Sequence, residues 1–95
     1  MANDISSRQW RLDTPIAYGQ PNAILWYGNI KVEHFEFSKY TAQGAKAILK
    51  DVNGKIVWDP TGSSTLEEVR SGKVGWVEGL CLDTLDSGIV LVYLA

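Results

Sequence analysis

KVGWVEGLCLDTLDSGIVLVYLA, the stretch from Lys73 to Ala95, decides the fold of this 95-residue chain. It holds three short apolar runs, and each has the length of a strand rather than of a helix. The runs are Val74 to Val77, Leu80 to Leu85 and Ile89 to Leu94. Asp86-Ser87-Gly88, between the last two runs, is typical of a tight hairpin turn. The stretch therefore predicts three consecutive strands.

The last of these runs is apolar on both faces of a strand. Val90, Val92 and Leu94 alternate with Ile89, Leu91 and Tyr93. A strand of a one-sided sheet alternates apolar with polar residues, so this pattern predicts either a central strand or an additional interface. Val90, Val92 and Leu94 are therefore candidate interface residues, at which the core of one subunit would continue into its neighbour.

The clearest strand upstream runs from Ile30 to Tyr40. Its apolar residues change phase by one position at His34, because Ile30 and Val32 are followed by Phe35 and Phe37. One extra residue in a strand produces such a shift, so we expect a β-bulge near His34. The alternative is that the strand changes its pairing from one sheet to another at this point.

Two short strands flank Asn53-Gly54 in the middle of the chain, Ala45 to Lys50 and Lys55 to Asp59. Asn-Gly between apolar runs predicts a type I′ hairpin turn, in which both central residues have positive φ. The following segment, Leu66 to Arg70, fits a short strand or irregular backbone better than one helical turn capped by Ser64 and Glu67. Further on, Gly75 and Gly79 are expected at bulges or tight bends.

The first part of the chain is more polar. Residues 1–7 are interpreted as a free arm, and Arg8 to Leu12 as an edge strand. A loop bracketed by Pro15 and Pro21 follows, because proline removes a ladder donor. Next comes the apolar run Ala23 to Tyr27, which Gly28-Asn29 is expected to close.

The strand pattern predicts an all-β fold. Seven or eight short strands alternate with turn signals, and no run resembles a helix of about 10 residues. We therefore expect an antiparallel β-sandwich or jelly-roll-like barrel. Residues 1–14 would form an N-terminal arm with an edge strand, and residues 15–95 a single β-sandwich domain.

Composition disfavours several classes of protein. The net charge is -2, whereas a dedicated nucleic-acid binder needs a concentrated basic face. Apolar runs never approach the ~18 residues that a membrane span requires. The beginning, MANDISSRQW, lacks the apolar centre of a signal peptide. The one cysteine, Cys81, rules out an internal disulfide and is interpreted as an ordinary strand residue.

The residues that usually carry chemistry are sparse. His34 is the only histidine, and no nucleophile elbow or phosphate-binding glycine loop is present. One histidine and one cysteine are too few for a zinc site, and the carboxylates lack calcium-loop spacing. Glu67-Glu68 and the pair Asp83 and Asp86 are interpreted as turn and surface residues. No catalytic, cofactor-binding or metal-binding residue is expected, so the sequence predicts a protein that is not an enzyme.

The aromatic residues are the remaining functional signal, with four tryptophans in the chain. Trp58 and Trp76 lie in strand patterns and are assigned to the core. Trp26 and Tyr27 are neighbours, and neighbours in a strand point to opposite faces. One of this pair should therefore be exposed unless a partner subunit covers it.

From Asn29 to Leu94 the chain resembles small virion proteins of tailed bacteriophages. The resemblance lies in an L-x-D-x-N-G-x-[IV]-x-W hairpin at Leu49 to Trp58 and in a T-L-D-S-G-x-x-x-V-Y-L ending at Thr84 to Leu94. Ile30-Lys31-Val32 and Glu78 to Leu82 also match. The first 28 residues lie outside this pattern.

This resemblance implies a capsid decoration, or cement, protein. Such a protein would bind the major capsid protein on the outer surface of the virion as an oligomer, with a homotrimer expected, after synthesis in the host cytoplasm. It implies no catalytic residue. No cofactor is expected, and neither a nucleic-acid nor a membrane partner is expected, as the charge and the short apolar runs already indicate. The alternative is a carbohydrate-binding or adhesin-type module of a head or tail fibre, which would use exposed Trp or Tyr side chains.

Attachment is expected to involve the N-terminal arm. Trp10 would act as an anchor, and Arg8 and Arg11 would contact acidic patches of the capsid. Deletion of residues 1–12 should then abolish capsid occupancy and leave the fold intact. The complete set of candidate interface residues is Arg8, Trp10, Arg11, Trp26, Tyr27, Val90, Val92 and Leu94.

Overall fold

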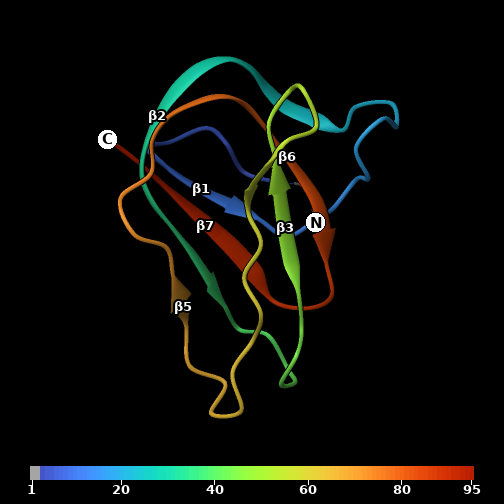
Figure 1. Ribbon diagram of the computed structural model, residues 1–95, viewed down its shortest axis with the longest axis vertical. Coiled ribbons are helices and arrows are strands. Elements are labelled where there is room, and N and C mark those ends of the chain that lie inside the picture. The colour runs from blue at the N-terminus through green and yellow to red at the C-terminus, as the bar shows by residue number, and fades with distance from the viewer. Residues whose placement is uncertain (1–2) are drawn as a thin grey trace.

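The computed structural model describes residues 3–95, and these residues form strands, turns and loops without a helix. Figure 1 shows the strands coloured by residue number, from blue at the N-terminus to red at the C-terminus. They are β1 (Gln9–Leu12), β2 (Ile24–Ser38), β3 (Ala47–Lys50), β4 (Ile56–Trp58), β5 (Val69–Arg70), β6 (Gly75–Leu85) and β7 (Ile89–Leu94). The predicted all-β class and strand number are confirmed. The described part of the chain holds no helix that is long and apolar enough to cross a membrane.

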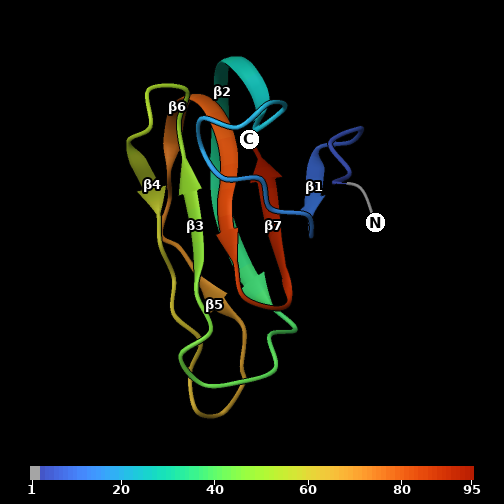
Figure 2. The same cartoon turned by 90° about the vertical axis from the view of Figure 1, so that its right-hand side faces the viewer.

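The strands form one open antiparallel sheet in the order β1-β7-β2-β6-β3-β4, with β5 paired to β2 off this path. The long strand β2 pairs with β6 through its first half and with β7 through its second half. In the side view, β3 and β4 lie on one side of β2 and β7, and β1 lies on the other (Figure 2). One continuous sheet therefore folds around the core, and hydrogen bonding does not divide it into two separate sheets.

The β-bulge expected near His34 is confirmed. Val32 pairs with Leu94 and His34 pairs with Tyr93, so Glu33 is the extra residue. At the same place β2 changes partner, because Val32 is also its last residue paired with β6. The phase shift in the sequence thus marks the point at which β2 passes from one part of the sheet to the other.

The β3–β4 hairpin is confirmed, but its predicted turn type is wrong. Gly54 has a φ of 83°, whereas Asn53 is not among the residues with positive φ. The Gly54 N–H donates to the Asp51 carbonyl oxygen at 3.1 Å, and the Asp51 N–H donates to that of Lys55 at 2.9 Å. This is the three-residue loop in which a type I turn is followed by a left-handed glycine. The Asp51 carboxylate favours it by accepting the N–H groups of Asn53 and Lys55.

Asp86-Ser87-Gly88 does not form the hairpin that the sequence predicts. Strands β6 and β7 are not neighbours, since β2 lies between them in the sheet. The turn instead carries the chain across the core, with the Asp86 N–H donating to the Lys46 carbonyl oxygen at 2.9 Å. Gly88 has a φ of 83° and lies against the backbone of Ser38 and Tyr40, where a side chain would not fit.

The expected break at Gly28-Asn29 is also wrong, because β2 continues through these residues. Trp26 pairs with Leu80 and Asn29 with Glu78, so two residues of β2 lie opposite the single residue Gly79. This is a β-bulge, and the φ of 78° at Gly79 agrees with the bend expected there. Strand β5 confirms the strand interpretation of the segment around Val69, and no helical turn forms.

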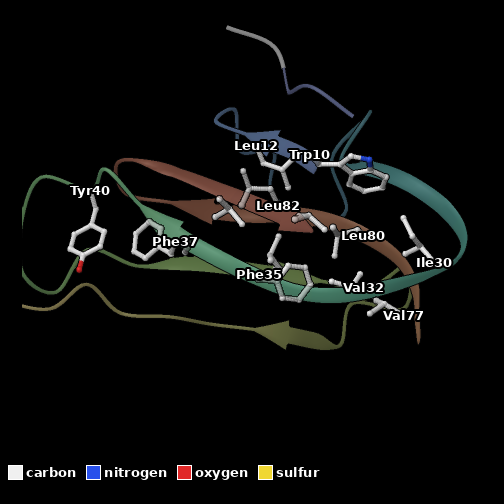
Figure 3. Packing of buried hydrophobic residues seen from close by; sticks show 14 of the residues in the cluster. Trp10, Leu12, Ile30, Val32, Phe35, Phe37, Tyr40, Val77, Leu80 and Leu82 are labelled. Carbon is white, nitrogen blue, oxygen red and sulfur yellow. The ribbon is translucent and has the colours of Figure 1, made fainter. Parts of the chain in front are cut away.

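The core lies between the two parts of the folded sheet (Figure 3). Its largest fully buried side chains come from β1, β2, β3, β6 and β7. Phe35 stacks on Trp58 with ring centroids 5.5 Å apart, and Phe37 stacks on Tyr40 at 4.8 Å. Trp58 packs partly buried against this cluster, as its assignment to the core predicts.

Strand β1 is the predicted edge strand, but the residues before it do not form a free arm. Asp4 and Arg11 exchange two backbone hydrogen bonds of 2.9 Å. The Asn3 side-chain oxygen accepts the N–H groups of Asp13 and Thr14, both at 2.8 Å. The chain therefore folds back along β1 from Asn3 onward. Residues 1 and 2 of the predicted arm lie outside the described residues.

Candidate functional site

The side chains that most often bind metals do not gather into one site in the described part of the chain. Among residues 3–95, no three or more His, Cys, Asp or Glu side chains come together as a metal site would require. His34 stacks on Tyr93 with ring centroids 4.3 Å apart. Cys81 is fully buried in β6 and donates its S–H to the Ile16 carbonyl oxygen at 3.6 Å. Burial raises the pKa of this thiol, and the nearby Asp83 charge raises it further, so the group is a poor nucleophile.

An open depression of about 670 Å³ lies beside β5 and is lined by Leu66, Glu67, Glu68 and Arg70. The Arg70 Nε donates to the Glu36 carboxylate at 2.9 Å, and its Nη2 lies 3.8 Å from the Glu68 carboxylate. Arg70 thus neutralises Glu36, the buried charged residue of the described core. The arrangement gives the charges of Glu36, Glu68 and Arg70 a structural explanation.

The loop before β2 is held against the sheet by Asp83. The Tyr18 N–H donates to Asp83 Oδ1 at 2.7 Å, and the Tyr18 hydroxyl donates to the Val52 carbonyl oxygen at 2.8 Å. Lys50 Nζ lies 3.6 Å from Asp83 Oδ2. The Tyr18 N–H is the main reason that the pKa of Asp83 lies below its ordinary value of 3.8, with Thr84 and Lys50 acting in the same direction. The Asp83 carboxylate therefore holds the loop before β2 against the sheet, where Ile16 of this loop contacts Cys81.

Replacement of Asp83 by asparagine is expected to destabilise the fold in a pH-dependent way. The carboxyl pKa is lower in the folded than in the unfolded chain, so its stabilisation is complete above pH 3.8 and is lost as the pH falls through the folded-state pKa. Urea unfolding at a series of pH values should show a difference between wild type and Asp83→Asn at pH 7 that shrinks below pH 3.8. A difference that stays constant with pH would show that the charge of Asp83 is not what matters.

Three of the predicted interface residues are buried inside the subunit, which corrects their assignment. Val90 and Val92 are 0% exposed and Trp10 is 2% exposed. Strand β7 lies between β1 and β2, and the folded sheet of the same chain covers its Val90 and Val92 face. The central-strand alternative is therefore confirmed. These residues have no surface left with which to contact a neighbour or a capsid.

Four other predicted residues keep exposed or partly exposed side chains, and we call them the core-end surface: Arg8, Trp26, Tyr27 and Leu94. The Leu94 N–H donates to the Arg8 carbonyl oxygen at 2.9 Å. The ring of Trp26 lies over that of Trp10, with centroids 5.7 Å apart. Trp26 is 41% exposed and Tyr27 is 74% exposed. The bulge beside them explains why both neighbours reach solvent, where simple alternation predicts only one.

Arg11 does not belong to this surface. It lies farther along β1, opposite Leu91 of β7, and its guanidinium is paired with the Asp13 carboxylate at 2.9 Å. Arg8, by contrast, makes no ion pair with any described residue. Of the two arginines predicted to contact the capsid, only Arg8 is therefore exposed and makes no ion pair with a described residue.

The sequence pattern also misplaces Trp76. Its side chain is 71% exposed on β6, although its strand pattern led us to assign it to the core. Trp76 pairs with Lys31 of β2. Two positions along the strands, Asn29 pairs with Glu78, and the side chains of this pair also face away from the core. The signal that identifies its face is Glu78, two residues later, because residues i and i+2 of a strand share a face.

Comparisons with known proteins add nothing to this description. No protein-family model matches the chain, and neither a curated protein nor a solved structure matches it. The functional proposals below therefore rest on the residues and on the sequence resemblance described above.

Proposed function

We propose that the chain is a non-enzymatic structural protein of a bacteriophage virion, a decoration protein that attaches to the major capsid protein. The resemblance of residues 29–94 to small virion proteins supports the class of protein. The observation that carries attachment is the core-end surface, in which Trp26 and Tyr27 are exposed, the Trp26 ring contacts Trp10 of β1, and the backbone of Arg8 bonds to that of Leu94. The proposed location is the outer surface of the capsid, reached after synthesis in the host cytoplasm.

The chemistry of the core-end surface suits a protein partner. Tryptophan, tyrosine and arginine are the residue types that most often dominate binding energy at protein interfaces. The surface is built on paired strands, so little backbone freedom has to be lost on binding. Arg8 would contact an acidic patch and Trp26 an apolar pocket of the shell. Because a shell offers many equivalent sites, modest contacts by linked subunits give a large total affinity.

The proposed assembly is a homotrimer, which fits a threefold position of a capsid. Val90 and Val92 are fully buried within each subunit and do not supply its contacts. The subunit contacts must therefore come from exposed residues. Loss of the trimer would lower avidity even if the core-end surface of each subunit were intact.

The variant Tyr27→Ala combined with Arg8→Glu tests the attachment surface. Both side chains are exposed, so the fold should be retained. Loss of two hot-spot contacts is expected to weaken binding to phage heads by at least about 30-fold, equivalent to roughly 2 kcal/mol. The measurement is co-sedimentation of purified protein with heads that lack it, over a range of protein concentrations.

The matched control is Ile56→Ala with Lys55→Glu, which removes an exposed apolar group and reverses a charge on the β3–β4 hairpin. It should bind heads like the wild-type chain. Equal binding by both double variants would contradict attachment through the core-end surface. Urea unfolding of each variant shows whether the fold has been kept.

A further inference from the structure

Trp76 lies on the outer face of the sheet, away from the core. Ile30 and Val77 form a buried pair, and the adjacent pair of Lys31 with Trp76 points to the opposite face because successive strand residues alternate. The Trp76 side chain is 71% exposed, and no ring contact with another aromatic residue is present among the described residues. The core does not use this indole, which leaves its surface available to a ligand.

Three exposed polar side chains surround the indole at defined positions of the sheet. Lys31 is directly opposite Trp76, and Asn29 is directly opposite Glu78. Residues directly opposite have Cβ atoms about 5 Å apart, and residues two apart in a strand are about 7 Å apart. The Asn53 Nδ2 group donates to the Glu78 carboxylate at 3.2 Å and holds it in place. Donors and acceptors thus stand around an aromatic platform.

The polar groups distinguish between two classes of ligand. A protein hot spot requires an apolar centre from which water is excluded, whereas the strand neighbours of Trp76 on this face carry an ammonium, an amide and a carboxylate. A pyranose ring presents an apolar C–H face that stacks on an aromatic ring, and hydroxyl groups at its edge that exchange hydrogen bonds with such side chains. The charges of Lys31 and Glu78 cancel, which favours an uncharged sugar over an acidic one.

We infer that Trp76, Lys31, Asn29 and Glu78 form a binding site for a neutral pyranose unit of an oligosaccharide or polysaccharide. Trp76 is the stacking platform, and the other three side chains exchange hydrogen bonds with hydroxyl groups. The site shares no residue with the core-end surface, and Lys31 and Trp76 face away from the core whereas Leu94 pairs with the inward-facing Val32. It is a single open platform, so useful affinity requires several copies on one particle.

Nuclear magnetic resonance titration of the full chain tests this inference. The probes are neutral tetrasaccharides of glucose, galactose, mannose and N-acetylglucosamine, added separately. At least one should shift the Trp76 indole N–H resonance, which is assigned by its absence in Trp76→Phe. Trp76→Ala should bind that sugar about tenfold or more weakly, and Glu78→Gln, which keeps the size of the side chain, should bind it several-fold more weakly.

The control is Ile56→Ala, which removes a 51% exposed apolar side chain on β4 and should leave sugar binding unchanged. Failure of all four sugars to shift the indole resonance would overturn the inference. So would loss of head attachment in Trp76→Ala without any sugar binding by wild type, since the surface would then contact protein. Head attachment by the core-end surface is measured separately, so either proposal can fail while the other stands.

Discussion

Replacement of Gly79 by alanine is expected to lower the free energy of unfolding by about 2 to 5 kcal/mol. Gly79 has a φ of 78°, which is unfavourable for any residue with a Cβ atom. An added Cβ would also lie 2.6 Å from the Trp26 carbonyl oxygen and would collide with the Val52 side chain. The backbone of β2 and the tip of the β3–β4 hairpin would both have to move. Urea unfolding followed by circular dichroism measures the change.

Gly75→Ala separates the two causes of this effect. Gly75 also has a positive φ, of 89°, but no atom outside Gly75 and its two chain neighbours lies within 4 Å of the position of an added Cβ. It should therefore show only the backbone cost of about 1 to 2 kcal/mol. If Gly79→Ala were no more destabilising than Gly75→Ala, the close packing of the bulge against Val52 would be contradicted.

Trp10→Ala is expected to destabilise the fold by about 3 to 5 kcal/mol, the usual cost of removing a large buried aromatic side chain. Trp10 is 2% exposed, lies in β1 opposite Val92 and contacts the ring of Trp26. Deletion of residues 1–12 would remove Leu12 as well, which is 0% exposed. The burial of both side chains argues against the sequence-based expectation that this deletion leaves the fold intact, and we expect the truncated chain to be largely unfolded.

Trp76→Ala is the matched control for this experiment, because it removes the same side chain from a position that is 71% exposed. Its effect on the urea midpoint should be small. Similar midpoints for Trp10→Ala and Trp76→Ala would contradict the burial of Trp10. Because a domain of this size has a total stability of only about 5 to 14 kcal/mol, the two variants should be easy to distinguish.

Local sequence patterns predicted most of the strands because each pattern reflects local geometry. The phase shift at His34 reflects an extra residue in one strand, and the bulge is where the pattern places it. The hairpin predicted at Asp86-Ser87-Gly88 was wrong because a short polar turn fits both a hairpin and a connection that crosses the core. The contacts that distinguish them, such as that of Gly88 with the backbone of Ser38 and Tyr40, depend on residues far apart in the sequence.

The candidate surface was predictable only in part, for a related reason. An apolar strand such as β7 has the same sequence whether its second face is covered by its own chain or by a neighbour. The folding of the sheet over Val90 and Val92, a property of the whole chain, decided this question. Trp76 was assigned to the core because its side chain is apolar. Strand alternation puts it on the same face as the charged Glu78, two residues later, which indicates an exposed position.

The most direct test of the proposed function is the amount of this chain on purified phage heads. Heads separated from tails should contain it in a fixed ratio to the major capsid protein, as measured by quantitative mass spectrometry. Heads stripped of the chain should take up the purified protein to the same ratio and no further. Absence of the chain from heads, or uptake without saturation, would contradict its role as a decoration protein.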